Sequence, residues 1–198
     1  MSEANNRNLP STIFNVDKTD YKTTELFLGE EGGLIDSINR PYPAIFDNYK
    51  KMLSLRWDEN EFDYGSCRQE FVTCSKGMYQ AMIYNLAYQW EADTVASKSI
   101  VPLLSPFITN SELWGATLAI GLNEYLHALT YSEIVRGSFD DPDQVFKEIL
   151  DVTESFQRLE AVARVFGFVH DVAHRYALKQ ATKEEAYDAL MMLYAALY

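Results

Sequence analysis

Three polar residues in one short stretch have the types and the spacing of a metal site. Glu124, His127 and Tyr131 are separated by three and four residues, which on a helix places them on one face. A carboxylate beside an imidazole can bind a transition metal. The phenol of Tyr131, one turn further on, would lie close enough to be oxidised by that metal. The pattern alone is weak, because a chance Glu-x-x-His is roughly a one-in-four event at this composition.

A third candidate ligand, Asp93, stands at the end of an apolar stripe on an earlier predicted helix. The stripe recurs at helical spacing and includes Phe71, Met78, Met82, Leu86 and Gln89. A carboxylate buried on such a face is costly unless it has a partner. Asp93 is therefore either solvated at the edge of the stripe or paired with another group, and the pattern leaves both open.

Helical bundles that hold two metal ions take one acidic residue from each of two helices and a Glu-x-x-His pair from each of the other two. Asp93 with Glu124 and His127 amounts to half of that set. The other two of the three histidines, His170 and His174, lie in a predicted helix end or loop, where we expect solvated side chains. The second half of such a site is therefore not found in this sequence.

The elements that would position these residues are predicted to be helices, and no strand alternation is present, so the expected class is all-α. Residues 1–40 are polar and are expected to form an extended arm, which Leu26–Leu28 could anchor. Helix starts are marked by capping residues, namely Ser66, Asn110 or Ser111, Asp141 before Pro142, and Thr182. The predicted helices span residues 44–55, 66–97 with a break near Ser75, 112–136 ending at Gly137, 141–162, and 182 onward, with 167–180 uncertain.

Composition narrows the classes of partner and location. The net charge is -12 with no cluster of Lys or Arg, which argues against nucleic acid and anionic membranes as partners. No apolar run approaches the ~20 residues of a membrane span, and residues 1–10 lack a signal-peptide core. We therefore expect a cytoplasmic protein. Cys67 and Cys74 form neither a zinc pattern nor a disulfide framework and are expected to be reduced.

Taken together, four ordered features resemble one family. They are the segment Asn85–Gln89 followed by Asp93, the triplet of Glu124, His127 and Tyr131, the preceding Trp57, and the spacing between them. The chain resembles the small, radical-generating subunit of class I ribonucleotide reductase, of the tyrosyl-radical type found in bacteria and their phages. The likeness covers nearly the whole chain, and the ordered set is far more specific than any single motif.

The resemblance implies a ferritin-like helical bundle and a role for each matching residue. Asp93, Glu124 and His127 would be ligands of the first iron, with Glu124 bridging to the second, and manganese is the alternative metal. Tyr131 would carry the stable radical, and Trp57 beside His127 would transfer an electron. In the family, iron and dioxygen generate the radical, which the large subunit uses to make deoxyribonucleotides.

The resemblance also implies that this sequence is incomplete. In the family, the remaining ligands lie downstream of the position of Tyr198, so residues 41–198 would be a partial ferritin-like domain. We expect the isolated chain to be inactive and to need a C-terminal half in trans. The completed subunit would form a homodimer and bind the large subunit. The alternatives are a non-catalytic helical assembly or dimerisation fragment, and another ferritin-like di-metal oxidase, against which Trp57 and Tyr131 argue.

Overall fold

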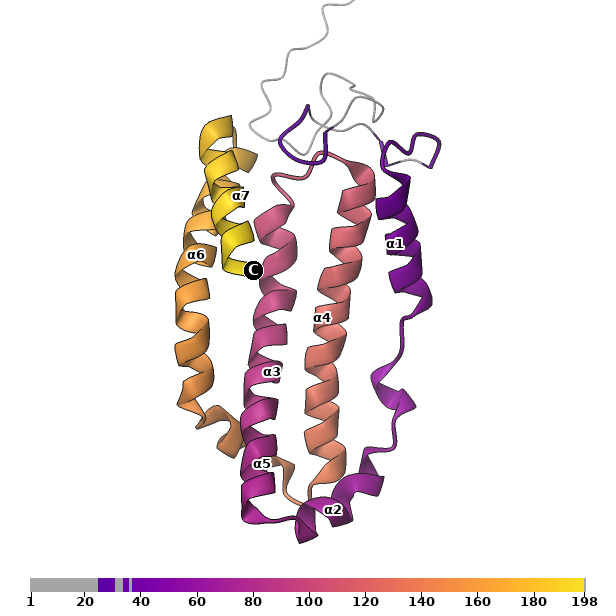
Figure 1. Cartoon of the computed structure of the whole chain (residues 1–198), viewed down its shortest axis with the longest axis vertical. Helices are drawn as coiled ribbons and strands as arrows, with labels where there is room; N and C mark the ends of the chain where they lie inside the picture. The colour runs from indigo at the N-terminus through magenta and orange to yellow at the C-terminus, as the bar shows by residue number, and fades with distance from the viewer. Residues whose placement is uncertain (1–24, 31–33, 36, 198) are drawn as a thin grey trace, which may run out of the picture. The chain divides into compact units, whose positions relative to one another are not determined.

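The structure is a computed structural model that describes residues 25–30, 34–35 and 37–197. It is 77% helical and has no strand in its described part, apart from an isolated bridge between Phe27 and Ile108. The elements (Figure 1) are α1 (Pro43–Ser54), η1 (Glu59–Glu61), η2 (Tyr64–Cys67), α2 (Arg68–Thr73), α3 (Lys76–Leu104), α4 (Ser111–Ser138), α5 (Pro142–Leu150), α6 (Thr153–Ala177) and α7 (Lys183–Leu197). The all-α prediction is confirmed, and the helices are consistent with a ferritin-like bundle.

The chain divides into two compact units. Unit 1 comprises Met1–Lys50, Pro102–Thr117 and Val165–Tyr198, and unit 2 comprises Lys51–Val101 and Leu118–Arg164. All five site residues predicted from the sequence fall in unit 2. No helix among the described residues combines the length and the apolar character that crossing a membrane would need.

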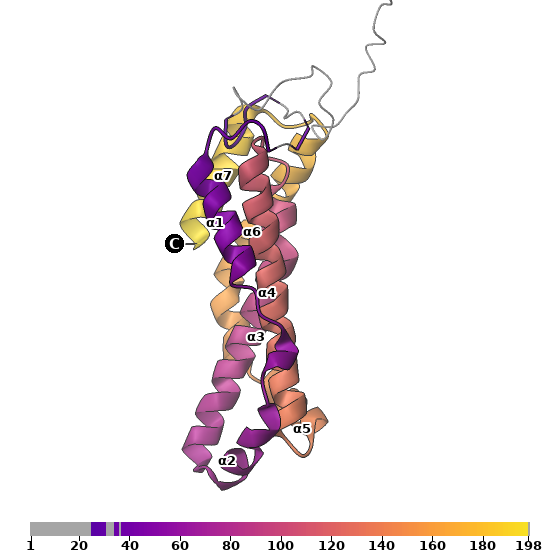
Figure 2. The ribbon, with the colours of Figure 1, turned by 90° about the vertical axis from the view of Figure 1, so that its right-hand side faces the viewer.

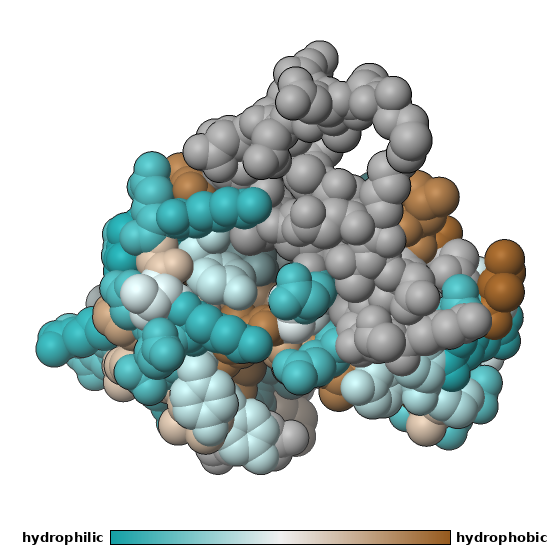
Figure 3. Space-filling model, turned by 90° about the horizontal axis from the view of Figure 1, so that it is seen from above, coloured by the Kyte–Doolittle hydropathy of each residue, from teal (hydrophilic) through white to brown (hydrophobic). Residues whose placement is uncertain are grey.

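The described part of unit 1 is organised around one apolar core. The residues of that core are Leu28, Leu103, Phe107, Val169, Val172, Ala173, Ala186, Ala189 and Leu193. The backbone N–H of Leu28 donates to the carbonyl of Phe107 at 2.8 Å, and that of Thr109 donates to Leu26 at 3.1 Å. The predicted anchor at Leu26–Leu28 is thus confirmed, whereas most of the predicted arm lies outside the described residues. Seen from above, the coloured surface in Figure 3 is mostly hydrophilic, with smaller hydrophobic patches.

Unit 2 contains α2, α5 and the larger parts of α3 and α4, and it carries the candidate site. Its segments of α3 and α4 run side by side in opposite directions (Figures 1 and 2), because Gly121 lies against Val101 while His127 lies near Asp93. The core residues are Ile83, Leu86, Ala87, Val135, Phe139, Val145, Ile149 and Val152. Burying each large apolar side chain contributes about 1.5–3 kcal/mol, so this core is what holds α3 against α4.

Three of the predicted helix caps are confirmed. The side chain of Asn110 accepts from Leu113 N at 2.9 Å at the start of α4. Asp141 accepts from Gln144 N at 3.0 Å, with Pro142 as the first residue of α5. At α7 the reciprocal capping box is complete, since Thr182 accepts from Glu185 N while the Glu185 carboxylate accepts from Thr182 N. Each cap satisfies backbone donors that the first helical turn leaves free.

Two predicted helix ends are wrong for local reasons. Ser66 does not cap α2; it lies inside η2, and its hydroxyl donates to the Asp63 carbonyl at 2.8 Å. Gly137 does not end α4, which continues to Ser138, and no described glycine has a positive φ. A Cβ at Gly137 would lie 2.7 Å from Cβ of Tyr64, so the glycine instead allows Tyr64 to approach the helix.

The other differences concern helix length. The helix predicted for residues 66–97 does break near Ser75, but α3 then continues through Pro102 to Leu104. The helix predicted for residues 141–162 is two helices, because α5 ends at Leu150 and the buried Val152 separates it from α6. The uncertain stretch 167–180 is mostly helical, as α6 runs to Ala177. Apolar periodicity persists across such short breaks, so it could not locate them.

Candidate metal site

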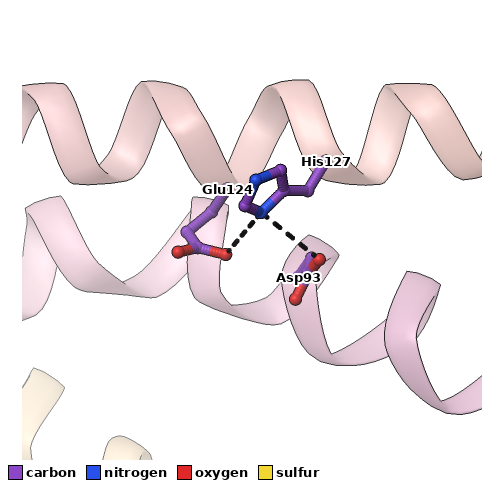
Figure 4. A group of neighbouring side chains, drawn as sticks. All are labelled: Asp93, Glu124 and His127. Carbon is purple, nitrogen blue, oxygen red and sulfur yellow. Dashed lines mark ion pairs between the residues drawn. The ribbon is translucent and has the colours of Figure 1, made fainter. Parts of the chain in front are cut away.

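Three of the predicted site residues meet between α3 and α4. Asp93 projects from α3 toward Glu124 and His127 on α4 (Figure 4). His127 Nδ1 lies 3.7 Å from Asp93 Oδ2 and 3.6 Å from Glu124 Oε2. Asp93 therefore does have a partner, which answers the question that its place in the apolar stripe left open.

A close approach of the two helices makes this meeting possible. A Cβ at Gly121 would lie only 2.8 Å from Cγ2 of Val101, so a larger residue at this position would push α3 and α4 apart. Gly121 precedes Glu124 by one helical turn. The sequence reasoning missed Gly121, because a single glycine inside a helical pattern gives no sign of which helix packs against it.

The donor set fits a transition metal ion. One ligand atom from each of Asp93, Glu124 and His127 lies within 4.8 Å of the other two, and this is the one such group among the described residues. Bonds of about 2.1 Å place neighbouring ligand atoms about 3 Å apart and opposite ones about 4 Å apart, so small side-chain adjustments suffice. The three side chains are 21–32% exposed. Three protein ligands leave coordination positions open for further groups.

Trp57 lies against the imidazole of this cluster. Its ring is stacked on His127 with a centroid separation of 5.9 Å and an interplanar angle of 21°. Phe62 packs edge-on against Trp57 at 5.6 Å. Trp57 belongs to the segment between α1 and η1, which Figure 2 shows in front of α4. The structure thus places the predicted electron-transfer residue in contact with a predicted ligand.

Tyr131 lies one turn beyond His127 and faces the same carboxylates. Burial raises the pKa of Tyr131 to about 12, and the charge of Asp93, a hydrogen bond to Asp93 and the charge of Glu124 act in the same direction. Its ring packs against the core of unit 2. The phenol is therefore held neutral, with a carboxylate available to accept its proton.

One contact of the cluster was not anticipated from the sequence. The amide Nδ2 of Asn123 lies 3.2 Å from Nε2 of His127, on the ring edge that faces away from the carboxylates. Asn123 precedes His127 by four residues, and this i, i+4 spacing is the signal that could have identified it.

His170 and His174 belong to a different part of the chain. Both lie in α6 within unit 1 and are exposed, in agreement with the solvated side chains expected from the sequence. The neighbouring Arg175 pairs with Asp171 and Glu185, each at 2.9 Å. Among the residues that the structure describes, neither histidine belongs to a group of potential metal ligands.

An all-α chain in which two carboxylates and an imidazole meet between adjacent helices has the features of a helical carboxylate–metal protein. No known family model matches the chain. It is similar to the ribonucleoside-diphosphate reductase subunit beta of Haemophilus influenzae (25% identity over 157 residues, 78% of this chain and 41% of the relative). It is also similar to the ribonucleoside-diphosphate reductase 1 subunit beta of Escherichia coli O157:H7 (26%, covering 78% and 41%) and to the subunit beta of Enterobacteria phage T4 (24%, covering 80% and 41%).

These similarities agree with the resemblance stated from the residues. The chain spans about two fifths of the length of the curated relatives that it matches, since the aligned part covers 41% of each of these three. These relatives belong to an oxidoreductase family.

Proposed function

We propose that this chain is the N-terminal half of a ribonucleoside-diphosphate reductase small subunit and supplies half of its di-iron site. Asp93, Glu124 and His127 would hold the first metal ion, with iron as the expected metal and manganese as the alternative. Glu124 would bridge to a second ion whose other ligands come from a C-terminal half in trans. Residues 1–40 would serve as an arm and residues 41–198 as the partial ferritin-like domain.

The observation that carries this proposal is the meeting of Asp93 with Glu124 and His127. They come from helices separated in sequence, yet their ligand atoms lie within 4.8 Å of one another. Similarity to reductase beta subunits over 78% of the chain supports the same family independently of that geometry. Trp57 and Tyr131, the two redox residues that the resemblance implies, both contact the cluster.

A pair of iron ions at such a site would supply the oxidising power that removes an electron from a tyrosine. The contribution of the chain is to prepare Tyr131 for that loss. A neutral phenol that loses an electron must also lose its proton, and Asp93, whose charge raises the pKa of Tyr131, is the carboxylate that would accept it. The packing of the ring against the core of unit 2 limits the access of water to the resulting radical. Trp57 would deliver an electron through its stacked contact with His127.

The partners follow from the same proposal. The completed small subunit would dimerise and pass its oxidising equivalent to a large subunit, which reduces ribonucleotides to deoxyribonucleotides. These reactions belong in the cytoplasm, and neither nucleic acid nor a membrane would be a direct partner of this acidic chain.

The test is reconstitution with a second fragment. The chain is co-expressed with a C-terminal portion of a beta subunit that carries the remaining carboxylate and Glu-x-x-His ligands, and the mixture is loaded with Fe²⁺ and exposed to air. We expect iron binding and a tyrosyl-radical signal in electron paramagnetic resonance, and Tyr131→Phe should abolish the signal. Tyr125→Phe is the matched control, because Tyr125 is on the same helix and is 58% exposed. A mixture that binds no iron and gives no signal would contradict the proposal.

A second candidate, a non-catalytic helical assembly fragment, is favoured by a different surface. Unit 2 has an open groove of about 440 Å³ between α3 and α6, lined largely by apolar side chains such as Val95, Leu159 and Val162. Glu91 and Val95 lie two residues before and two residues after Asp93. Their side chains therefore point about 200° away from that of Asp93, so the groove lies on the opposite face of α3 from the candidate metal site. Gel filtration and metal analysis distinguish the two proposed functions. An assembly fragment would be a metal-free oligomer that does not bind the second fragment.

A further inference from the structure

The imidazole of His127 is held on three sides by the contacts described above. The carboxylates of Asp93 and Glu124 face Nδ1, and Trp57 covers one face of the ring. The third contact is Asn123, whose amide nitrogen is 3.2 Å from Nε2. We infer that Asn123 is a positioning residue, which keeps Nδ1 of His127 directed at the two carboxylates whether or not a metal is bound.

The chemistry of an amide explains why one side chain can serve both states. Without metal, the carboxylates favour the tautomer with the proton on Nδ1, which leaves Nε2 as an acceptor for the amide N–H of Asn123. When Nδ1 binds a metal, the proton must sit on Nε2 and needs an acceptor. Rotating the Asn123 amide by half a turn presents Oδ1 to that proton. A carboxylate could serve only the second state, and an apolar side chain neither.

Asn123 is well placed for this role by the helix that carries it. It precedes His127 by four residues on α4, so the two side chains are neighbours without any demand on tertiary packing. Its side chain is exposed, so the amide is free to rotate between its two orientations. The contact therefore belongs to α4 itself and should survive in the chain without a partner.

The first experiment reads the tautomer of His127 in the metal-free full chain. Long-range ¹⁵N–¹H correlation spectra of the neutral ring give the ratio of the Nδ1–H to the Nε2–H form. Asn123→Asp offers only acceptor oxygens to Nε2, so it should shift this ratio toward Nε2–H by about tenfold. Asn85→Asp is the matched control, an exposed amide on α3 of the same unit, and it should leave the ratio unchanged. An Asn123→Asp spectrum that matches the control would overturn the inference.

The second experiment rests on the proposed metal site and uses Mn²⁺ alone, measured by loss of the free-ion paramagnetic resonance signal. Asn123→Leu should weaken Mn²⁺ binding about 10- to 100-fold, the usual effect of removing the partner of a ligating histidine. Asn123→Gln should restore part of that loss, whereas Asn85→Leu should have no effect. Equal binding by the wild type and Asn123→Leu would contradict a positioning role. If no variant binds Mn²⁺ while the tautomer still responds to Asn123→Asp, positioning by Asn123 is supported and the metal proposal fails.

Discussion

The indole of Trp57 lies almost parallel to the imidazole of His127, with 5.9 Å between the ring centroids. This contact joins a residue from the irregular segment before η1 to a predicted metal ligand in the middle of α4. An aromatic ring in contact with a ligand senses the electronic state of whatever the ligand holds. Trp57 is therefore the tryptophan stacked on a predicted ligand, whereas Trp90, three residues before Asp93 on α3, packs against Phe146.

We predict that Co²⁺ quenches tryptophan fluorescence mainly through Trp57. Titration of the wild type should reduce the emission, because a paramagnetic ion bound to His127 would sit on the ring against which the indole is stacked. Trp57→Phe should lose most of the metal-dependent change, whereas Trp114→Phe, in the first turn of α4 and several turns before His127, should retain it. Equal fractional quenching in the wild type and Trp57→Phe would show that the ion binds elsewhere.

We predict that metal stabilises the chain only when the carboxylate of Asp93 is present. A ligand that binds only the folded state at about 100 times its dissociation constant adds about 2.7 kcal/mol to the free energy of unfolding. Mn²⁺ should therefore raise the melting temperature of the wild type, and chelation should reverse the increase. Asp93→Asn should remove it, and Asp143→Asn, an exposed carboxylate on α5, should not. An unchanged increase in Asp93→Asn would exclude Asp93 as a ligand.

The raised pKa of Tyr131 predicts a loss of stability in strong alkali. In the unfolded chain the phenol ionises near its ordinary pKa of about 10, whereas in the folded chain Tyr131 keeps its proton up to a pKa of about 12. The unfolded state thus gains stability between these values, and the free energy of unfolding falls as the pH rises from about 10 to about 12. Urea denaturation of Tyr131→Phe across this range should show a shallower fall than the wild type.

Tyr79 provides an independent comparison. Burial and a 2.8 Å hydrogen bond to Glu148 raise the pKa of Tyr79 to about 12, so Tyr79→Phe should reduce the alkaline loss as well. The double variant should show the smallest fall in the free energy of unfolding over this pH range. If the free energy of unfolding fell with pH as steeply in both single variants as in the wild type, neither tyrosine would retain its proton on folding.

Two glycines inside helices are predicted to respond to alanine in opposite directions. A methyl group at Gly137 would meet Tyr64 at 2.7 Å, and overpacking of this kind costs about 1–3 kcal/mol. Gly167, inside α6, has nothing within 4 Å of an added Cβ, so Gly167→Ala should raise the free energy of unfolding by up to about 1 kcal/mol. Chemical denaturation of the two variants measures whether each substitution raises or lowers the free energy of unfolding. Stabilisation by Gly137→Ala would show that Tyr64 does not pack against α4.

A buried carboxylate in unit 1 is predicted to act through its hydrogen bond and not through its charge. Glu112 is 4% exposed; its Oε2 accepts from Tyr42 N at 2.9 Å, and its Oε1 has no partner among the described residues. Glu112→Gln keeps an acceptor and should change stability by less than about 1 kcal/mol, whereas Glu112→Met orphans the Tyr42 N–H and should cost about 1–3 kcal/mol. A larger loss in Glu112→Gln than in Glu112→Met would reverse this assignment.

The sequence by itself determined the features that depend on neighbours along the chain. Apolar periodicity indicated the all-α class, and the caps Asn110, Asp141 and Thr182 form as predicted because their hydrogen bonds span only three residues. The spacing of Glu124, His127 and Tyr131 placed them on one face of a helix for the same reason. Similarity to the beta subunits agrees with the family that these residues suggested.

Only the tertiary structure decided what lies across from each helix. Periodicity could not show whether Asp93 was solvated or paired; the packing of α3 against α4 at Gly121 gives it His127 as a neighbour. It also could not show that Gly137 serves the approach of Tyr64 instead of ending a helix. In both cases the answer depends on residues far apart in sequence, and a glycine that admits a neighbouring side chain looks the same in the sequence as one that ends a helix.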